Sequence, residues 1–299
     1  MISNPIPWPN KARCAVAFTF DMDAEALLHV NFREQAPERV ALASMLRYEP
    51  QVAVPRLLEI FRRFDLRQTF FIPGWCVEAY PGCVEQILAA GHELGHHGYL
   101  HKRPNAQSRD EEADSLGRGI EALKRLSGQR PAGYRAPAYA FSRHTLELLQ
   151  ESGFRYDSSL MGDDQPYLIG NGRGDLVELP TDMSLDDWTQ YVCIKEFGYM
   201  LPIASPERAM EVFRAEFDAA WRHGGLWNAV WHPFVSGRPS RADAFAGLIE
   251  YMEEKGGVWF ATLAEIAAHV RGLAEQGIWQ PRRDQVPFWP EPLQDRELS

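Results

Sequence analysis

The densest group of potential metal ligands in the chain is segment 92–101, HELGHHGYLH, which holds four of the nine histidines. His97 and His101 are separated by three residues. On a loop that leaves a strand, this spacing lets two imidazoles converge on one ion, and Gly98 allows the chain to turn between them. Two neutral imidazoles need an anionic third ligand to hold a divalent metal. The pattern therefore predicts a metal site that is completed by a carboxylate from elsewhere in the chain.

The same segment contains a competing pattern, because residues 92–96 (HELGH) match the HExxH signature of zinc proteases. That chemistry requires both histidines one turn apart on a single helix. Gly91 ends a predicted helix and Gly95 interrupts the segment, so we expect no helix there. The third histidine of the extended protease signature is also out of register. The sequence therefore favours His97 and His101 as the ligands.

The best source of the carboxylate is the segment FDMDAE, in which Asp21 and Asp23 follow the first apolar strand. Carboxylates at such a position cost burial energy unless they are paired or bound to metal. Two aspartates that flank one residue can divide the work, with one on the metal and one beside the attacking water as general base. A solvated loop or a helix cap is the alternative explanation.

Two further residues at predicted strand ends have the right types for hydrolysis. Arg135 lies in the rigid turn GYRAP, where its guanidinium could hold a catalytic carboxylate ionised and oriented. His232 follows the apolar strand LWNAVW, a position that suits a proton donor to a leaving amine. The alternatives are an ordinary salt bridge for Arg135 and a structural strand-end role for His232.

The elements that must position these residues alternate between apolar strands and amphipathic helices. Strands are predicted at 15–20, 68–72, 93–95, 176–179, 226–231 and 258–261, and helices at 55–64, 84–90, 110–126, 142–151, 206–222, 241–255 and 263–273. Such alternation predicts an α/β fold with a parallel sheet and right-handed crossovers. About seven such units would close a barrel, whose reactive side chains lie where strands end and loops begin.

Composition narrows the partners. A net charge of −10 argues against nucleic acids and anionic membranes, which require a basic surface. The four cysteines form no CxxC pair, so we expect reduced core residues, although a Cys76–Cys83 bridge is an alternative. We find neither a signal peptide nor an apolar run long enough to span a membrane, so the expected location is cytoplasmic.

Taken together, the motifs resemble those of the NodB-homology polysaccharide deacetylases, the carbohydrate esterase family 4 fold group, over roughly 13–270. The strand that ends in two aspartates, the His-x3-His of HGYLH, the Arg-x-Pro of RAPAY and the late histidine of WHP occur in the family's order. The resemblance implies a distorted (β/α)7 barrel of the NodB-homology type. It also implies a hydrolase of non-peptide C–N bonds that uses water activated by a divalent metal, for which we expect Zn²⁺.

The resemblance also implies a role for each matching residue. Asp21 resembles the family's base, Arg135 the arginine that tethers it and His232 the general acid, while Asp23, His97 and His101 resemble the metal ligands. Substrate contacts are expected from Ala138, Tyr139 and Trp188. We expect a single domain over 1–299, in which the Pro- and aromatic-rich arm 275–299 packs on its own domain or on a neighbouring subunit of a homo-oligomer.

This sequence departs from the family pattern at several points. Met22 separates the two aspartates, and Ala138 stands where an aromatic residue often follows the Arg-x-Pro. The aspartate that supports the pocket is left open among Asp157, Asp163, Asp164 and Asp187. The motifs GHHGYLH and SGRPSR resemble an intracellular subgroup that includes peptidoglycan-deacetylase-like, allantoinase-like and cyclic imide hydrolase members.

Several functions therefore remain open. A small cyclic imide or ureide is favoured as substrate, because the aromatic-rich segment 186–200 could cover a small pocket. An N-acetylated amino sugar or peptidoglycan fragment is the alternative. From another class, a non-haem iron oxygenase also uses two histidines and a carboxylate, although its sites usually lie in β-rich barrels. A non-catalytic metal-binding protein would not need Asp21, Arg135 and His232.

Overall fold

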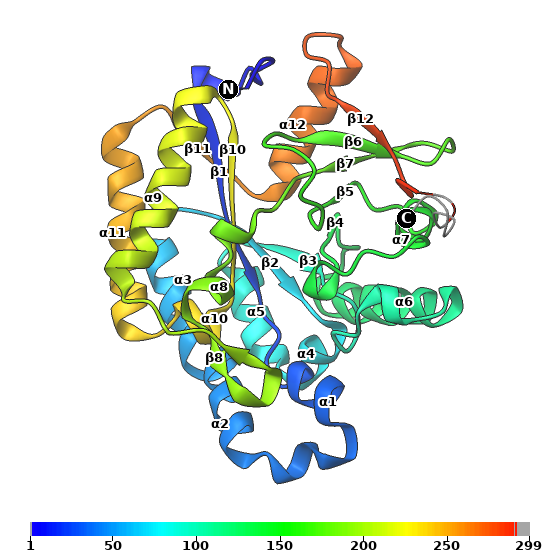
Figure 1. Ribbon diagram of the computed structural model, residues 1–299, viewed down its shortest axis with the longest axis vertical. Coiled ribbons are helices and arrows are strands. Elements are labelled where there is room, and N and C mark those ends of the chain that lie inside the picture. Colours follow the sequence, from blue (N-terminus) through cyan, green and yellow to red (C-terminus); the bar gives the residue numbers. More distant parts are fainter. Residues whose placement is uncertain (1, 290, 292–299) are drawn as a thin grey trace, which may run out of the picture.

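The computed structural model describes residues 2–289 and 291, and its core is one large, mostly parallel sheet (Figure 1). Across the described part, seven parallel strands follow one another in the order β10 (Leu226–Trp231), β1 (Cys14–Asp21), β2 (Thr69–Ile72), β3 (Glu93–His96), β4 (Gly133–Tyr134), β5 (Tyr156–Asp157) and β7 (Asp175–Glu178). This order confirms the predicted α/β class.

Strand β1 lies at the centre of the core, and all eight of its residues are buried. One side of β1 pairs with β10, from Ala15 opposite Leu226 to Phe20 opposite Trp231. On its other side, the first half of β1 pairs with β11 (Val258–Phe260) and its end pairs with β2. A strand that is covered on both faces explains the continuous apolar run in the sequence.

The sheet curves towards a barrel that is not closed by a backbone ladder between β7 and β10 in the described residues. A side chain bridges this gap instead. Asn228 of β10 donates from Nδ2 to Pro180 O at 3.0 Å and to Ser158 Oγ at 3.1 Å. Nearby, Asp186 forms an isolated parallel bridge with Val230. The architecture therefore agrees with the distorted barrel that the family resemblance implies.

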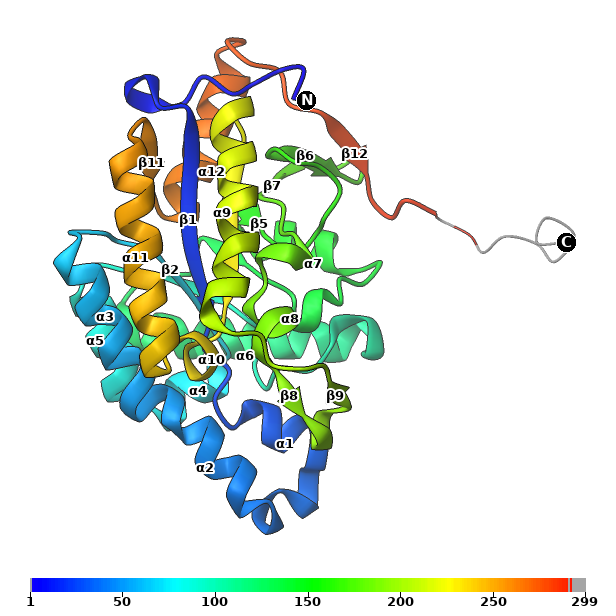
Figure 2. The same cartoon turned by 60° about the vertical axis from the view of Figure 1, so that its left-hand side comes forward.

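The predicted helices lie on the outside of the sheet with bounds shifted by a few residues (Figures 1 and 2). They are α3 (Val54–Arg63), α5 (Pro81–Ala89), α6 (Arg109–Ser127), α7 (Thr145–Glu151), α9 (Pro206–His223), α11 (Pro239–Lys255) and α12 (Leu263–Glu275). Helix α6 begins with a capping box, in which Ser108 and Glu111 satisfy each other's backbone N–H groups, and it ends at left-handed Gly128. Local capping chemistry therefore explains why its ends were predictable.

Other elements were not predicted. Strand β6 (Tyr167–Gly170) runs antiparallel to β7, and β12 (Arg283–Gln285) pairs with β6 at the edge of the sheet. Helices α1 (Ala26–Phe32) and α2 (Val40–Tyr48) project from the lower end of the molecule in Figure 1, and the short helices α4 (Gly74–Ala79), α8 (Asp187–Tyr191) and α10 (Pro233–Ser236) lie in the loops that follow strands. Part of the predicted arm 275–299 thus joins the sheet as β12, whereas residues 290 and 292–299 lie outside the described residues.

The cysteines agree with the expectation of reduced thiols, because all four are free. Cys14 and Cys76 are buried, Cys83 is half-buried and Cys193 is exposed. The alternative of a Cys76–Cys83 bridge is therefore not supported. Within the described ranges, no helix is both long and apolar enough to cross a membrane.

Candidate active site and metal centre

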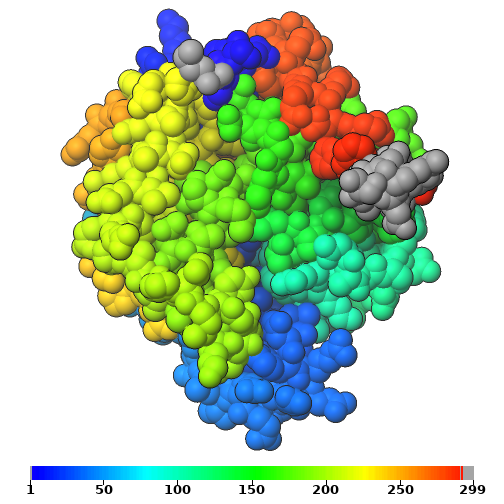
Figure 3. Space-filling model, in the orientation of Figure 1, coloured from blue at the N-terminus to red at the C-terminus, as the bar shows by residue number. Residues whose placement is uncertain are grey.

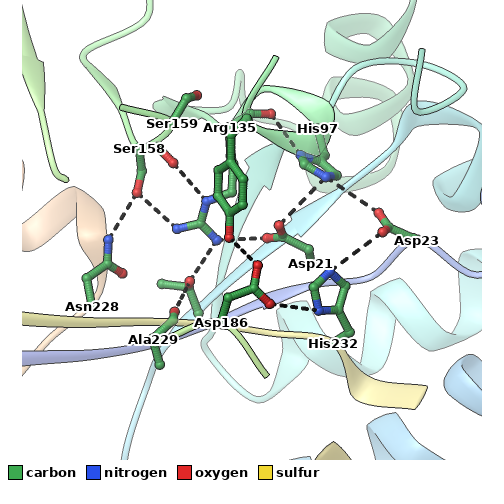
Figure 4. A network of polar contacts seen from close by, with 12 residues as sticks. Asp21, Asp23, His97, Arg135, Ser158, Ser159, Asp186, Asn228, Ala229 and His232 are labelled. Carbon is green, nitrogen blue, oxygen red and sulfur yellow. Dashed lines mark hydrogen bonds and ion pairs between the residues drawn. The ribbon is translucent and has the colours of Figure 1, made fainter. Parts of the chain in front are cut away.

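The polar residues singled out in the sequence meet at the carboxyl ends of the parallel strands (Figure 4). Asp21 is the last residue of β1, His97 follows β3 directly and Arg135 follows β4. His232 follows β10 in the same way. Parallel strands carry their carboxyl ends on one edge, so segments more than 200 residues apart in the chain supply one site.

Asp23, His97 and His101 are close enough to share one ion. His97 Nε2 lies 3.5 Å from Asp23 Oδ1, and His101 Nε2 lies 3.4 Å from Asp23 Oδ2. A zinc ion with tetrahedral ligands at about 2.1 Å would place neighbouring ligand atoms about 3.4 Å apart. One ligand atom from each of the three residues lies within 4.8 Å of the others. The spacing therefore fits a divalent metal.

The chemistry of the three side chains fits the same conclusion. Asp23 Oδ1 is buried and has no hydrogen-bond partner among the described residues. Burial raises the pKa of Asp23 to about 6, against the neighbouring imidazoles, so its carboxylate lacks the compensation that a cation would supply. Burial lowers the pKa of His97 and brings that of His101 to about 4. Both imidazoles are therefore neutral at neutral pH and can act as ligands.

A second hydrogen bond orients the first imidazole. His97 Nδ1 lies 2.8 Å from the carbonyl oxygen of Arg135, to which it donates in the tautomer that leaves Nε2 free. Gly98 (φ +72°) and His101 (φ +52°) both have left-handed backbones. The chain thus turns sharply twice within HGYLH and brings the two Nε2 atoms to the same carboxylate, as the spacing predicted.

Asp21 is held by Arg135 rather than by the metal ligands. Arg135 Nη1 donates to Asp21 Oδ1 at 2.8 Å, while Asp21 Oδ2 lies 3.7 Å from His97 Nε2. Burial alone raises the pKa of Asp21, but the charge and hydrogen bond of Arg135 together with the nearby imidazoles outweigh it, and the pKa lies below the usual value. Asp21 is therefore an ionised carboxylate with one oxygen beside the metal site.

Arg135 is fully buried and each part of its guanidinium has a partner. Nε donates to Ser158 O at 2.9 Å, Nη2 to Ser158 Oγ at 2.9 Å and Nη1 to Thr19 Oγ1 at 2.7 Å. Next to it, Ala136 N donates to Ser159 Oγ at 2.8 Å. The segment after β5 therefore fixes the arginine and, through it, the orientation of Asp21 (Figure 4).

His232 is paired with Asp187, which answers the question of the supporting aspartate. Asp187 Oδ1 lies 2.8 Å from His232 Nδ1, and Asp187 Oδ2 accepts the His232 backbone N–H at 3.0 Å. Burial alone lowers the pKa of His232, but the hydrogen bond and charge of Asp187, with smaller contributions from Asp186 and Asp23, raise it to about 10. The imidazole is therefore a protonated donor at neutral pH.

The other three candidates for that role lie elsewhere. Asp157 accepts Ser159 Oγ at 2.8 Å behind the arginine, and Asp163 pairs with Arg282 at 2.7 Å. Among the described residues, Asp164 forms no ion pair with the reactive groups. Asp187 is thus the one of the four aspartates that the structure brings to His232.

Asp186 and Tyr139 form one wall of the site. Tyr139 donates its hydroxyl to Asp186 Oδ2 at 2.7 Å, and Asp186 lies 4.0 Å from His232 Nδ1. Burial raises the pKa of Asp186 to about 6. Ala138 (φ +52°) and Tyr139 (φ +56°) are both left-handed without being glycine, a costly backbone that is often found at functional sites. Tyr139, one of the predicted substrate contacts, therefore reaches the carboxylate beside His232, and Ala138 precedes it in the chain.

A cluster of aromatic side chains, called the aromatic roof below, lies next to His232. The roof consists of Phe32, Trp188, Phe197 and Tyr199. Trp188 packs edge-on against His232 with ring centroids 5.1 Å apart, and it contacts Tyr199 at 5.2 Å. Phe197 stacks against both Trp188 and Phe32. This stacking connects α1 to the hairpin of β8 (Cys193–Ile194) and β9 (Tyr199–Met200).

Access to the reactive groups is narrow. The side chains of Asp21, Asp23, His97, His101 and His232 are at most 11% exposed. Figure 3 shows an opening near the middle of the face, between yellow-green and teal segments, in which blue atoms from the N-terminal part of the chain are visible. Within segment 186–200, Trp188 is the aromatic residue that packs against His232.

The histidines of the HExxH pattern have structural positions, as expected. His92 Nδ1 accepts the Gln68 backbone N–H at 3.0 Å, and His96 Nε2 lies 3.0 Å from Leu116 O. Burial lowers their pKa values to about 4 and about 3, respectively. Residues 93–96 form strand β3 rather than a helix, so the two imidazoles do not share a helical face.

Several residues that support the site were not predicted from the sequence, namely Thr19, Glu49, Ser158, Ser159 and Asp186. Only Asp186 carried a usable signal, because it precedes Asp187-Trp188 in the pattern DDW. The other four make contacts to segments distant in the chain, such as Arg135 to Thr19. Contacts between segments that are distant in the chain leave no local spacing pattern in the sequence.

Comparison with known proteins agrees with the geometry. A family model described as polysaccharide deacetylase matches residues 34–156. A peptidoglycan deacetylase from Helicobacter pylori is 33% identical over 279 residues, which cover 84% of this chain and 94% of the relative. A solved structure from Mycobacterium smegmatis, provisionally named a polysaccharide deacetylase, is 41% identical with a TM-score of 0.89, covering 98% and 99% of the two chains. A solved allantoinase is 25% identical with a TM-score of 0.78, covering 90% and 95%.

Proposed function

The chain belongs to the polysaccharide deacetylase family, a family of hydrolases of non-peptide carbon–nitrogen bonds, and from this premise we propose that it opens the amide bond of a small cyclic imide or ureide. The observation that carries the proposal is the arrangement of Asp23, His97 and His101 between Asp21 and His232. Asp23 Oδ2 lies within 4.0 Å of both His101 Nε2 and His232 Nε2, and Asp21 lies on the other side of His97.

Asp23, His97 and His101 would hold the divalent metal. Such an ion, for which we propose Zn²⁺, supplies Lewis-acid polarisation of a carbonyl and lowers the pKa of water to about 7. The two neutral imidazoles and one carboxylate match the ligand set of a catalytic zinc site that keeps a position open. The hydrogen bond from His97 Nδ1 to Arg135 O keeps the ligand oriented.

Asp21 acts as the general base. Its Oδ2 atom faces the ligand cluster at 3.7 Å from His97 Nε2, while Arg135 occupies Oδ1. The free oxygen takes a proton from the attacking water as the water oxygen bonds to the carbonyl carbon. The low pKa of Asp21 keeps this base ionised throughout the neutral range.

His232 acts as the general acid on the opposite side. When the bond from the carbonyl carbon to nitrogen breaks, the nitrogen takes the proton from His232 Nε2. Asp187 stabilises the imidazolium before transfer. A backbone N–H near Ala138 would stabilise the developing negative charge on the carbonyl oxygen, a contribution of roughly 3–4 kcal/mol for one donor. The products are a carboxylic acid, which ionises, and a neutral amide or ureide nitrogen on the same molecule. Asp21 loses the proton it took from water, His232 takes up one proton, and one proton is released to solvent.

The near-complete burial of the reactive groups supports a small substrate. All five reactive or ligating side chains are nearly buried, and Trp188 contacts His232 under the roof. A flat ring of a few atoms can enter such a site, whereas a long polymer requires an open groove. Trp188 and Tyr139 supply an apolar ring and a hydroxyl for that ring to contact, which supports substrate-binding roles for both.

An N-acetylated amino sugar is the second candidate. The observation in its favour is the similarity to the Helicobacter pylori peptidoglycan deacetylase over 94% of that protein. The same Asp21 and His232 would then release acetate from the N-acetyl group. The two candidates differ in product, because ring opening leaves one molecule whereas deacetylation leaves two.

A product assay separates the candidates. The zinc-loaded protein is incubated with succinimide, hydantoin and allantoin, and separately with N-acetylglucosamine and chito-oligomers. The proposal expects ring-opened acids from the first group and little acetate from the second. Acetate release at the higher kcat/KM would establish the second candidate and contradict the first.

We also propose that residues 1–299 form one domain, since β12, from the described part of the arm, lies in the same sheet as β1. The four free thiols support a reducing compartment, for which we propose the cytoplasm.

A further inference from the structure

We propose that Glu49 is a positioning residue that holds the Asp23 loop against the His232 loop and thereby sets the affinity of the metal site. This inference rests on the proposed function, since it takes Asp23 as a ligand. Glu49 begins the π-helical turn η3 (Glu49–Ala53) between α2 and α3, and it is fully buried. Single π-helical turns of this kind occur frequently at functional sites.

The Glu49 carboxylate accepts one backbone N–H from each loop. Oε2 accepts from Ala24 N, the residue directly after Asp23. Oε1 accepts from Phe234 N at 3.3 Å, two residues after His232. One side chain thus joins the loop after β1 to the loop after β10, although it lies 185 residues from the second loop. The distance between Asp23 and His232 therefore depends on Glu49.

The conformation of Ala24 shows why the first contact matters. Ala24 has φ +42°, a left-handed backbone that costs energy for a residue with a β-carbon. The bond from its N–H to Glu49 compensates part of that cost. Without it, residue 24 can relax to an ordinary backbone, and the preceding Asp23 turns away from His97 and His101.

A neighbouring contact supports the same role for this segment. Tyr48 donates to Gly237 O at 3.1 Å and Arg56 Nη1 donates to the same oxygen at 2.5 Å. Residues on both sides of Glu49 therefore hold the far end of the His232 loop. The whole α2–α3 turn fits closely against residues 234–237, and Glu49 is the member of it that also reaches Ala24.

The two contacts require an oxygen acceptor at both positions, which a carboxyl group supplies and an amide does not. Burial and the charge of Asp23 raise the pKa of Glu49 well above its usual value, and a protonated carboxyl oxygen still accepts from an N–H donor. Both oxygens of Glu49 accept from an N–H donor. Glutamine has nearly the same shape, but one of its two terminal atoms is itself a donor. Glu49→Gln therefore places the glutamine amide NH2 group opposite a backbone N–H at one of the two loops. Two donors then face each other, although the side chain fills the same space.

The test measures zinc affinity by competition with a chromogenic chelator, in the wild type, Glu49→Gln and Glu112→Gln. Glu112 is a matched control, because it is also a buried helical glutamate that accepts two side-chain hydroxyls, from Ser142 and Thr145. Glu49→Gln is expected to weaken zinc binding by about 10- to 100-fold, the usual range for supporting contacts of metal ligands. Glu112→Gln is expected to leave the affinity within about twofold. Equal affinities in Glu49→Gln and the wild type would overturn the proposal.

A second variant separates positioning from general destabilisation. Glycine adopts a left-handed backbone without strain, so Ala24→Gly added to Glu49→Gln is expected to restore part of the lost affinity. No recovery would contradict the role assigned to the Ala24 contact. If Glu49→Gln alone is insoluble, the double variant is compared with Ala24→Gly, and equal affinities would overturn the proposal. Failure of the wild type to bind zinc would instead refute the proposed function.

Discussion

His232 and Asp187 form the most completely defined pair in the site, with Nδ1 of the histidine 2.8 Å from Oδ1 of the aspartate. The second oxygen of Asp187 accepts both the His232 backbone N–H at 3.0 Å and the Ser236 hydroxyl at 2.6 Å. The aspartate is fully buried, so solvent does not screen this pairing. Its consequence is a histidine that carries a proton well above neutral pH.

The first prediction concerns the alkaline limit of activity. Burial lowers the pKa of His232, but Asp187 and the other nearby carboxylates raise it to about 10. An acid must be protonated to act, so activity should persist as pH rises and fall near pH 10. Asp187→Asn removes the main compensating charge, which lowers this pKa and moves the alkaline limb of the kcat/KM profile down by at least about one unit. An unchanged limb would refute His232 as the acid.

Asp21 is predicted to act as the general base and not as a metal ligand. Asp21→Asn should lower kcat by about 100- to 10,000-fold, because general base catalysis contributes on that order. The variant should still bind one zinc per chain, as measured by metal analysis after gel filtration. Loss of zinc together with activity would instead make Asp21 a ligand.

Arg135 should control the acidic limit of activity. Its charge holds the pKa of Asp21 low against the effect of burial. Without that charge the pKa of Asp21 rises, so the base becomes protonated at a higher pH. The acidic limb of the kcat/KM profile therefore moves to higher pH. Arg135→Met should also cost about 3–5 kcal/mol of stability, because it leaves a buried carboxylate unpaired.

Arg135→Lys is the matched variant, since it keeps the charge and loses the fork that contacts Ser158. It should move the acidic limb less than Arg135→Met does. Equal shifts in the two variants would contradict an electrostatic role for Arg135.

Substitution of His92 tests whether the HExxH pattern of zinc proteases binds the metal. In the structure, His92 Nδ1 accepts a backbone N–H from Gln68, and the ring packs against Phe61 and Phe70. His92→Gln should change the free energy of unfolding by about 1 kcal/mol and leave one zinc per chain with normal kcat. Loss of zinc in His92→Gln would restore HExxH as the metal site.

The alternation of strands and helices was predictable because buried parallel strands and amphipathic helices leave clear local patterns. The antiparallel strand β6, which ends at Gly170, was not predicted, although all four of its residues are buried. Strand β12 lies in a proline-rich tail, and its ladder partner among the described residues is β6. Such pairing depends on the tertiary fold and leaves no periodic signal in the sequence.

The site was predictable to the extent that its residues lie at strand ends in dense motifs, as do Asp23, His97 and His101. Asp187 remained one of four candidates because its partner His232 is 45 residues away. Glu49 was not predictable because the groups that donate hydrogen bonds to its carboxyl group are backbone N–H groups of distant loops. Supporting residues of this kind become evident only when the fold brings the loops together.

The central claim is that Asp23, His97 and His101 bind the metal on which C–N hydrolysis depends. The most direct test strips the protein with a chelator, adds zinc back and measures bound zinc together with amide hydrolysis in the wild type and in His101→Ala. The wild type should recover one zinc per chain and its activity, whereas His101→Ala should recover neither. Full hydrolysis by metal-stripped His101→Ala would contradict the claim.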